Sequence, residues 1–181
     1  RIVSKRESYA IRISGLVDGD HDFSFELDQQ FFAIFENPEF EKGMVQARVI
    51  FEKKTGILAL HFNLSGEVEA ICDRCLEPFM VPVETEQTIF VKLGEVAGEV
   101  DDDVIIITRD EHEIDVAQYM YEFIILALPF QRIHPEDKYG NSSCDPSMLK
   151  KLEAHTAKDL DQNNRSDPRW DALKGIIEKN K

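Results

Sequence analysis

Hydrophobic and polar residues alternate near the start of the chain. In SYAIRIS, Tyr9, Ile11 and Ile13 recur at every second position, and DFSFEL repeats this spacing with Phe23 and Phe25. A period of two is typical of a strand that buries one face. The segment QQFFAIFENPEF breaks the alternation and predicts a short helix before the next strands. The chain therefore opens with half-buried strands and one helical interruption.

A meander of strands is predicted next. Strands over 44–52 and 57–64 are joined by a turn at 53–56, and Gly66 is expected to make a second bend. The segment FMVPVETEQTIFVKL reads as a further strand, in which Pro82 indicates an edge or a bulge because proline has no N–H for the ladder. The apolar run VIIIT, which acidic residues flank, predicts a buried strand.

From Asp115 the period changes to that of a helix. Asp115 suits an N-cap, and Gln118 stands three positions later, as in a capping box. The segment Val116–Leu128 is apolar nearly all round, and Pro129 ends it. An apolar helix of this kind is expected to be buried against the sheet.

The predicted fold class is therefore α+β, with a mainly antiparallel sheet or half-open barrel packed on one buried helix. This core domain spans 1–145. The remainder, 146–181, predicts a helical tail, because two of its segments begin with Asp-Pro and Trp170 starts an apolar helical face.

Charge is concentrated in the middle of the chain. The net charge of the 181 residues is −14, and residues 67–115 hold 15 acidic and three basic residues. We interpret this block as one acidic face that attracts basic partners, with Asp101, Asp102, Asp103 and Trp170 as candidate partner-binding residues. A chain so acidic lacks the broad basic surface that phosphate contacts require. Any direct RNA contact is assigned to Lys53 and Lys54, to the basic residues Arg1, Lys5, Arg6 and Arg12, and to the tail.

The cysteine count favours a reducing compartment. Three cysteines, an odd number, do not suit a disulfide framework. No apolar run approaches the ~20 residues that span a bilayer. We therefore expect a cytoplasmic protein with no membrane segment; its oligomeric state stays open.

The segment CDRCLEPF holds two of the three thiols. Cys72 and Cys75 have the spacing that lets a turn present two thiolates to one tetrahedral ion, and Cys144 and His134 are candidates for the other two positions. This set would make a structural zinc site of three cysteines and one histidine. A redox pair and a pair of unreactive thiols remain alternatives. A redox pair usually sits where a strand meets a helix, whereas a strand-like segment follows here.

Several motifs occur in the order of one bacterial family. They are CDRCLEPF, EIDV, IILALPF, IHPED, Cys144 and DPRWDALKGI. From Cys72 to the C-terminus the chain resembles the YceD-like large ribosomal RNA subunit accumulation proteins. Many members carry further cysteines after the equivalent helix, whereas Cys144 stands alone here and His134 takes the remaining place.

The resemblance implies a non-enzymatic factor for large-subunit ribosomal RNA accumulation and ribosome assembly. With the charge argument, it suggests that the partner is a basic ribosomal protein or a precursor of the large subunit. The alternative is a thiol oxidoreductase or zinc-dependent enzyme that uses Cys72 and Cys75.

Overall fold

The computed structural model describes residues 8–36, 38–54, 57–101 and 103–155. Tertiary contacts divide the chain into two compact units, Arg1–Cys144 and Asp145–Lys181. In the second unit, α3 (Pro146–His155) begins after Asp145, whose Oδ1 accepts a hydrogen bond of 3.1 Å from the N–H of Ser147. The predicted tail is described only as far as α3. Trp170 lies outside the described residues, so the role of the tail stays a prediction.

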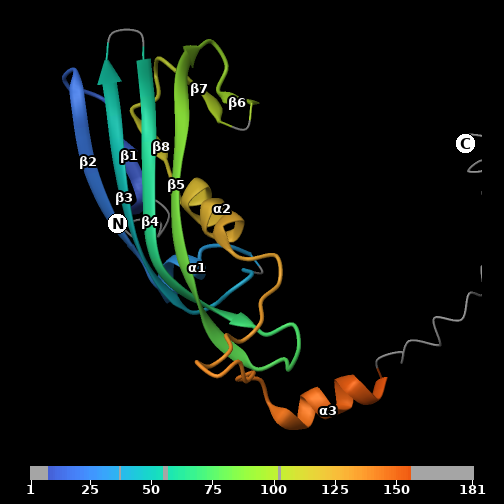
Figure 1. Cartoon of the computed structure of the whole chain (residues 1–181). Helices are drawn as coiled ribbons and strands as arrows, with labels where there is room; N and C mark the ends of the chain where they lie inside the picture. Colours follow the sequence, from blue (N-terminus) through green and yellow to red (C-terminus); the bar gives the residue numbers. More distant parts are fainter. Residues whose placement is uncertain (1–7, 37, 55–56, 102, 156–181) are drawn as a thin grey trace, which may run out of the picture. The chain divides into compact units, whose positions relative to one another are not determined.

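The described residues of the first unit form a six-stranded sheet in the order β2–β3–β4–β5–β7–β6 (Figure 1). Its strands are β2 (Gly19–Leu27), β3 (Gly43–Lys54), β4 (Ile57–Ile71), β5 (Pro78–Gly94), β6 (Gly98–Asp101) and β7 (Val104–Thr108). All neighbours are antiparallel except β5 and β7, which run parallel. Among these residues β2 and β6 do not pair with each other, so the sheet stays open. The predicted α+β class with a mainly antiparallel sheet is confirmed, and closure into a barrel is not observed.

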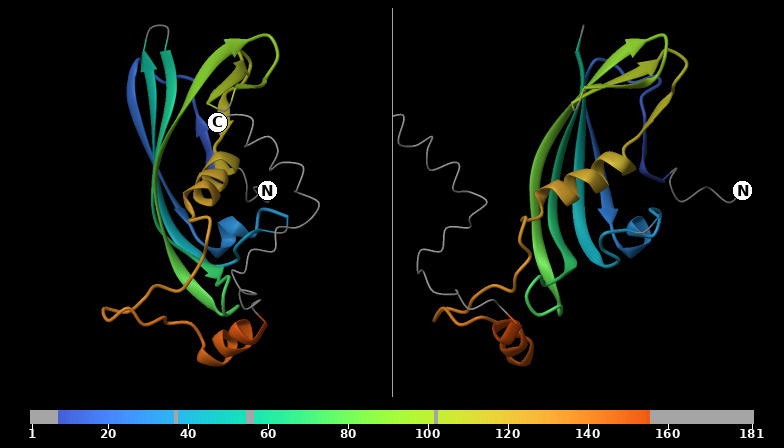
Figure 2. Two further views of the ribbon diagram at one scale, coloured as in Figure 1. Left: turned by 45° about the vertical axis from the view of Figure 1, so that its right-hand side comes forward. Right: turned by 90° about the vertical axis from the view of Figure 1, so that its right-hand side faces the viewer.

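The core lies on the concave side of this curved sheet, where Figure 2 shows α1 (Gln29–Phe32), α2 (Ala117–Ala127) and the separate β1–β8 pair (Ala10–Arg12 and Glu113–Asp115). Period-two alternation supplies one wall, for example Val45, Val49 and Phe51 on β3. The helices supply the other, and each fully buried side chain of this size contributes about 1.5–3 kcal/mol to folding. The fully buried side chains of the whole core include Phe31, Phe32, Phe62, Leu60, Leu64, Met120 and Ile124.

Helix α2 differs from the prediction at its start and in its burial. Val116 occupies the N-cap with no side-chain cap bond, although the Oδ1 of Asp115 accepts from the N–H of Ala117 at 2.9 Å. Gln118 donates to Glu122 at 2.6 Å, so no capping box forms. One face of α2 is buried, whereas Leu126 is 74% exposed. The helix therefore lies across the concave face of the sheet, with one of its sides packed against the core and the other exposed.

Strand β4 continues through Gly66, where a bend was expected. The reason for glycine is close approach: a Cβ at this position would lie 2.1 Å from the carbonyl oxygen of Met44 on β3. Pro82 pairs with Glu67 of β4, and β7 joins β5 only from Phe90 onward. Pro82 therefore lies in the part of β5 that pairs on one side only among the described residues, as the prediction of an edge required.

Replacing Gly66 with alanine should destabilise the first unit by at least about 2 kcal/mol, because the atom that the new Cβ meets is backbone and cannot rotate away. Denaturant titration of the free energy of unfolding measures this. Gly98→Ala is the matched control, since nothing lies within 4 Å of a Cβ there. Equal stability of the two variants would contradict the close approach of β3 and β4.

Candidate metal centre

The turn between β4 and β5 presents two cysteines on one side. Cys72 follows the last residue of β4, its N–H donates to the carbonyl of Glu77 at 3.0 Å, and its own carbonyl accepts from the N–H of Leu76 at 3.0 Å. Leu76 adopts φ 62°, a left-handed conformation that costs a non-glycine residue about 1–2 kcal/mol. This tight turn directs the thiols of Cys72 and Cys75 inward, where they are 0% and 2% exposed.

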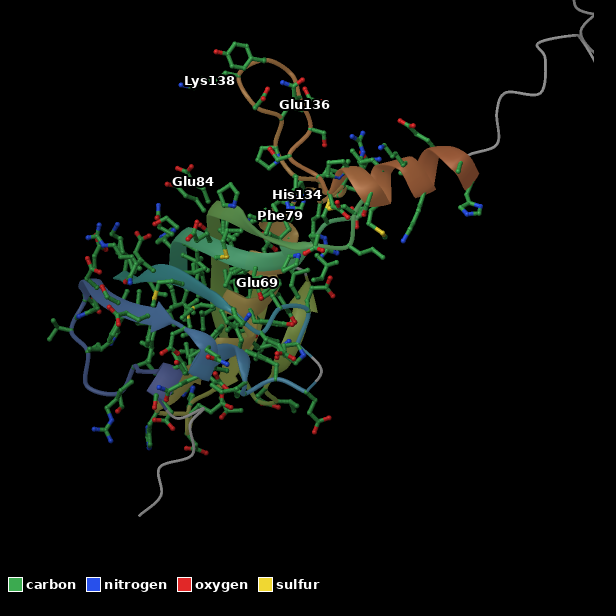
Figure 3. All side chains as sticks on the ribbon, turned by 90° about the horizontal axis from the view of Figure 1, so that it is seen from below. Glu69, Phe79, Glu84, His134, Glu136 and Lys138 are labelled. Atoms are coloured by element: carbon green, nitrogen blue, oxygen red, sulfur yellow. The ribbon has the colours of Figure 1, made fainter. Side chains whose placement is uncertain are left out.

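The segment after α2 brings the other two candidate ligands to this turn. The N–H of Asp73 donates to the carbonyl of Arg132 at 2.7 Å, and the N–H of Arg132 donates to Oδ2 of Asp73 at 2.7 Å. The ring of Phe79 lies against the ring of His134, with centroids 4.6 Å apart (Figure 3). These contacts fix the segment at its start and aim His134 at the thiols.

A loop that closes on itself then returns the chain to the turn. Glu136 and Ser142 form an antiparallel bridge, and Oδ1 of Asp137 accepts from the N–H groups of Tyr139 and Asn141, each at 2.8 Å. In Figure 3 the part of this loop that bears Glu136 and Lys138 projects away from the sheet. Cys144 follows His134 by ten positions in the sequence. It nevertheless lies beside His134, because the loop between them folds back.

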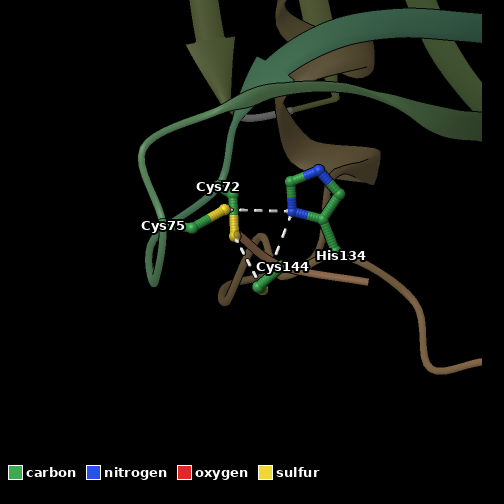
Figure 4. A group of neighbouring side chains, drawn as sticks. All are labelled: Cys72, Cys75, His134 and Cys144. Carbon is green, nitrogen blue, oxygen red and sulfur yellow. Dashed lines mark hydrogen bonds between the residues drawn. The ribbon is translucent and has the colours of Figure 1, made fainter. Parts of the chain in front are cut away.

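The four side chains meet as a compact set (Figure 4). All ligand atoms of Cys72, Cys75, His134 and Cys144 lie within 4.8 Å of one another. The sulfurs of Cys72 and Cys144 are 3.7 Å apart, and Nδ1 of His134 is 3.4 Å from the sulfur of Cys75 and 3.7 Å from that of Cys144. A zinc tetrahedron with ordinary bond lengths separates two sulfurs by about 3.8 Å, and sulfur from nitrogen by about 3.6 Å. The observed distances fit that geometry.

The electrostatics of the cluster favour one thiolate. Burial opposes ionisation of Cys72, yet hydrogen bonds from the backbone at Cys75, Arg74 and His134 and from the His134 ring lower the pKa of its thiol from 9.0 to about 6. A hydrogen bond with Ser142 acts to lower the pKa of Cys144, but burial and the sulfurs of Cys72 and Cys75 outweigh it and raise that pKa. Thiolates are the form of cysteine that binds metal, and Cys72 is poised to supply one.

Four protein ligands leave no position for a substrate or a water molecule on a tetrahedral ion, which is the arrangement of structural zinc sites. The three thiols are free of disulfides and buried. A thiol–disulfide exchange reaction needs access to the attacking sulfur, and burial of Cys72 and Cys75 opposes it. The geometry thus suits a clip that joins the β4–β5 turn to the segment after α2.

Of the other predicted site residues, the structure describes the side chains of Lys53, Lys54 and Asp103, and their roles stay predictions. The ammonium of Lys53 donates to the carbonyl of Leu16 at 2.6 Å, and Lys54 pairs with Glu52, so both cations are already engaged. Asp103 is exposed at the start of β7, and its carbonyl accepts from the N–H of Phe90 at 2.7 Å. Asp102 and Trp170 lie outside the described residues, as does the side chain of Asp101.

The described carboxylates of the acidic block are spread along the sheet. Glu67, Glu69 and Glu84 lie on β4 and β5 toward the thiol turn, Glu86 lies near the middle of β5, and Glu95, Asp103, Asp110 and Glu111 lie beside β6 and β7. Eleven positions separate Glu84 from Glu95, which is about 36 Å for a fully extended chain. Asp102 and the side chains of Glu99 and Asp101 lie outside the described residues, so the single acidic face stays a prediction.

Sequence reasoning missed the residues that hold the cluster in place. Phe79 stacks on His134, Ser142 accepts from the N–H of Cys144 at 3.2 Å, and Asp73 bonds Arg132. The side chain of Arg132 also reaches Glu39 at 2.7 Å. Phe79 stands in the quoted motif CDRCLEPF, so it carried a signal. The other contacts join segments 59 or 93 positions apart, or depend on a loop conformation that has no periodic pattern.

Comparison with known families gives one match over the larger part of the chain. The profile described as large ribosomal RNA subunit accumulation protein YceD matches residues 60–177. The chain belongs to this family. The YceD match includes all four clustered ligands and confirms the resemblance found in the sequence motifs. The family name points to a ribosome-related factor with a role in large-subunit RNA accumulation.

No curated protein and no solved structure matched the chain.

Among the residues that the structure describes, none of the helices combines the length and the apolar character needed to cross a membrane.

In metal-free protein, thiolate absorbance should reveal one thiol that ionises near pH 6 and that disappears in Cys72→Ser. Because the folded pKa lies below the ordinary value of 9.0, this group stabilises the fold fully above about pH 9, and the contribution is lost as the pH falls through 6. The free energy of unfolding of the wild-type metal-free protein should therefore fall more steeply between pH 9 and pH 6 than that of Cys72→Ser. Parallel profiles would contradict the lowered pKa.

Proposed function

We propose that the chain is a non-enzymatic factor for large-subunit ribosomal RNA accumulation that acts in the cytoplasm by binding a basic ribosomal protein or a precursor of the large subunit. The observation that carries the proposal is that a YceD family match covers the cluster of three cysteines and one histidine. That cluster has the form of a closed structural site. A factor that binds and positions other molecules needs such a scaffold and no reacting group.

Zinc is the ion that the cluster fits best. Thiolates and a neutral imidazole are the ligands of structural zinc sites, and the four ligand atoms lie within 4.8 Å of one another, which is compatible with a shared ion. Cys72, Cys75, His134 and Cys144 would hold the ion, which supplies a cross-link and no reaction chemistry. Oxygen-preferring ions such as Mg²⁺ do not suit this set, since it holds no carboxylate.

The charge of the chain supports protein over RNA as the direct partner. Ribosomal RNA is a polyanion, and affinity for it comes largely from phosphate contacts with lysine and arginine. The net charge here is −14, and Lys53 and Lys54 are engaged within the chain. The carboxylates on β4 and β5 and beside β7 favour cationic proteins instead.

The runner-up is a thiol oxidoreductase or zinc-dependent enzyme that uses Cys72 and Cys75. Two observations favour it: the pKa of Cys72 is about 6, and the sulfur of Cys144 lies 3.7 Å away, in reach of a disulfide after a small movement. Metal content and thiol reactivity separate the scaffold from the oxidoreductase, because a filled four-ligand site has no free thiolate. A zinc-dependent enzyme would instead keep one coordination position for water or substrate.

Purified full-length protein should contain one zinc per chain and no thiols that react quickly. Cys75→Ala and His134→Ala should lose most of the metal, whereas His134→Cys should keep it, since a site of four cysteines is equally suited to zinc. Elemental analysis and thiol titration measure both quantities. Ser143→Ala, next to Cys144 but outside the cluster, is the control. Metal-free wild-type protein with three reactive thiols would contradict the zinc site.

Cells that lack the gene should accumulate less large-subunit RNA, with small-subunit RNA unchanged, and should show fewer mature large subunits on density gradients. Wild-type protein should restore both, and Cys75→Ala should restore less than Ser143→Ala, because loss of the clip loosens the scaffold. An unchanged ratio of the two RNAs in the deletion strain would contradict the proposed function.

Association of the tagged protein with precursor particles should survive nuclease and weaken as salt rises.

A further inference from the structure

The convex face of the sheet divides into two halves of different character. Around the middle of the strands its polar side chains satisfy one another: Arg48 bonds Asp22, Asn63 donates to Glu86 at 2.8 Å, and His61 bonds Thr88 at 3.0 Å. Asn63 and His61 bond their registered partners on β5, whereas Arg48 reaches Asp22 diagonally from β3 to β2. We call this region the polar half. It is an ordinary solvent-facing sheet surface.

Near the thiol turn the same face is apolar. Met44 of β3, Ile71 of β4 and Met80 of β5 are 52%, 52% and 42% exposed, and Pro78 and Pro82 are exposed beside them. We call these five residues the apolar patch. Register places them in adjacent rows, because Glu67 pairs with both Met44 and Pro82, Glu69 pairs with Met80, and Ile71 pairs with Pro78. The intervening residues, such as Val68 and Val81, are buried on the opposite face.

Carboxylates surround and interleave this patch. Glu67 and Glu84 are exposed, and Glu69 accepts a hydrogen bond from Lys42 at 2.9 Å (Figure 3 labels Glu69 and Glu84). Apolar side chains at solvent-facing positions with a polar rim are the mark of a protein interaction surface. Methionine is favoured at such surfaces because its flexible side chain adapts to the partner.

Charge decides between two occupants of the patch. In a symmetric dimer through this face, the glutamates of one copy would face those of the other, and like charges brought together on desolvation cost several kcal/mol. A partner segment with apolar side chains between lysines or arginines meets the same surface with favourable pairs. The patch is therefore suited to a cationic partner and not to a second copy.

We propose that the apolar patch is the surface on which a basic protein segment docks, with aliphatic or aromatic side chains on Met44, Ile71 and Met80 and cationic side chains on Glu67 and Glu84. This inference rests on the proposed function and names the surface that serves it. Three rows of side chains span only about 14 Å along the strands, so the patch is the desolvated centre of a larger contact.

The position of the patch gives the metal centre a role. Ile71 immediately precedes Cys72, and Pro78 begins β5 just after the thiol turn. The clip therefore holds the end of the patch in register. Docking chemistry lies on the patch, and the clip maintains its shape.

The test uses the full-length protein, immobilised, and as a probe the mixed proteins of purified large ribosomal subunits freed of RNA. One variant removes apolar area (Ile71→Ser with Met80→Ser), and one reverses charge (Glu67→Lys with Glu84→Lys). Each should weaken retention of the basic proteins about tenfold or more, as loss of an interface centre does. Zinc content and thermal unfolding should match wild type, because all four positions are exposed.

Matched controls separate the patch from general charge. Phe90→Ser changes an exposed aromatic residue at the far end of the same face, and Glu95→Lys with Asp110→Lys makes the same charge change beside β7. Both controls should retain the probe within about twofold of wild type. Equal losses in the patch and control charge variants would show a general field and overturn the proposal.

The remaining outcomes of the binding test decide which of the two proposals stands. If wild type retains the probe and the patch variants retain it equally, the docking surface is wrong and the proposed function stands. If wild type binds RNA-free proteins no better than an unrelated acidic protein does, both fail. Binding of protein-free large-subunit RNA that the patch variants abolish would replace the protein partner with RNA. Self-association that the patch variants abolish would make the patch a dimer contact; either result overturns the proposal.

Discussion

The join between the β4–β5 turn and the segment after α2 is the constraint on which the site depends. The thiols of Cys72 and Cys75, in the turn of the β4–β5 hairpin, lie close to the imidazole of His134 and the thiol of Cys144. These last two residues belong to the segment that follows α2. Apart from the clustered ligands, the segment from Pro129 to Cys144 is held by the Asp73–Arg132 pair, by the Arg132–Glu39 ion pair and by the contact between the rings of Phe79 and His134. A metal ion bound by these four ligands would cross-link the two segments and reduce the conformational entropy of each.

The same hairpin carries two surfaces with different purposes. Its inward positions fill the concave core, and its outward positions form the polar half and then the apolar patch. Strand alternation separates the core side chains from the solvent-facing ones, since successive side chains of a strand point to opposite faces of the sheet. Because β4 and β5 stay paired along their length, the position of the thiol turn fixes the position of the patch. The scaffold and the proposed docking surface thus depend on the same pairing register of β4 and β5.

Much of the local structure could be predicted from the sequence. Alternation in DFSFEL and in the segments around Val49 and Phe62 predicted the strands, because burial of one face requires a period of two. The spacing of Cys72 and Cys75 predicted a two-thiol turn, and His134 and Cys144 were the remaining ligand types with no periodic role. The family followed from the same motifs.

Features set by tertiary contacts could not be predicted. The capping-box expectation at Asp115 failed because Gln118 bonds Glu122 and the helix begins one residue later. Charge counted along the chain does not record how β4 and β5 distribute the carboxylates over the sheet, so the expectation of one acidic face stays a prediction. Nor does a sequence show that solvent-facing Met44 and Met80 lie in neighbouring rows, since only the strand register places them together.

X-ray absorption at the zinc edge of the purified full-length protein tests the central claim most directly. The account predicts one zinc with three sulfur ligands at about 2.3 Å and one nitrogen ligand at about 2.0 Å. It also predicts no oxygen ligand and a spectrum that does not change when partner proteins bind. An ion with an oxygen in its coordination shell, or a protein that holds no zinc when prepared without chelators, would contradict a closed structural clip.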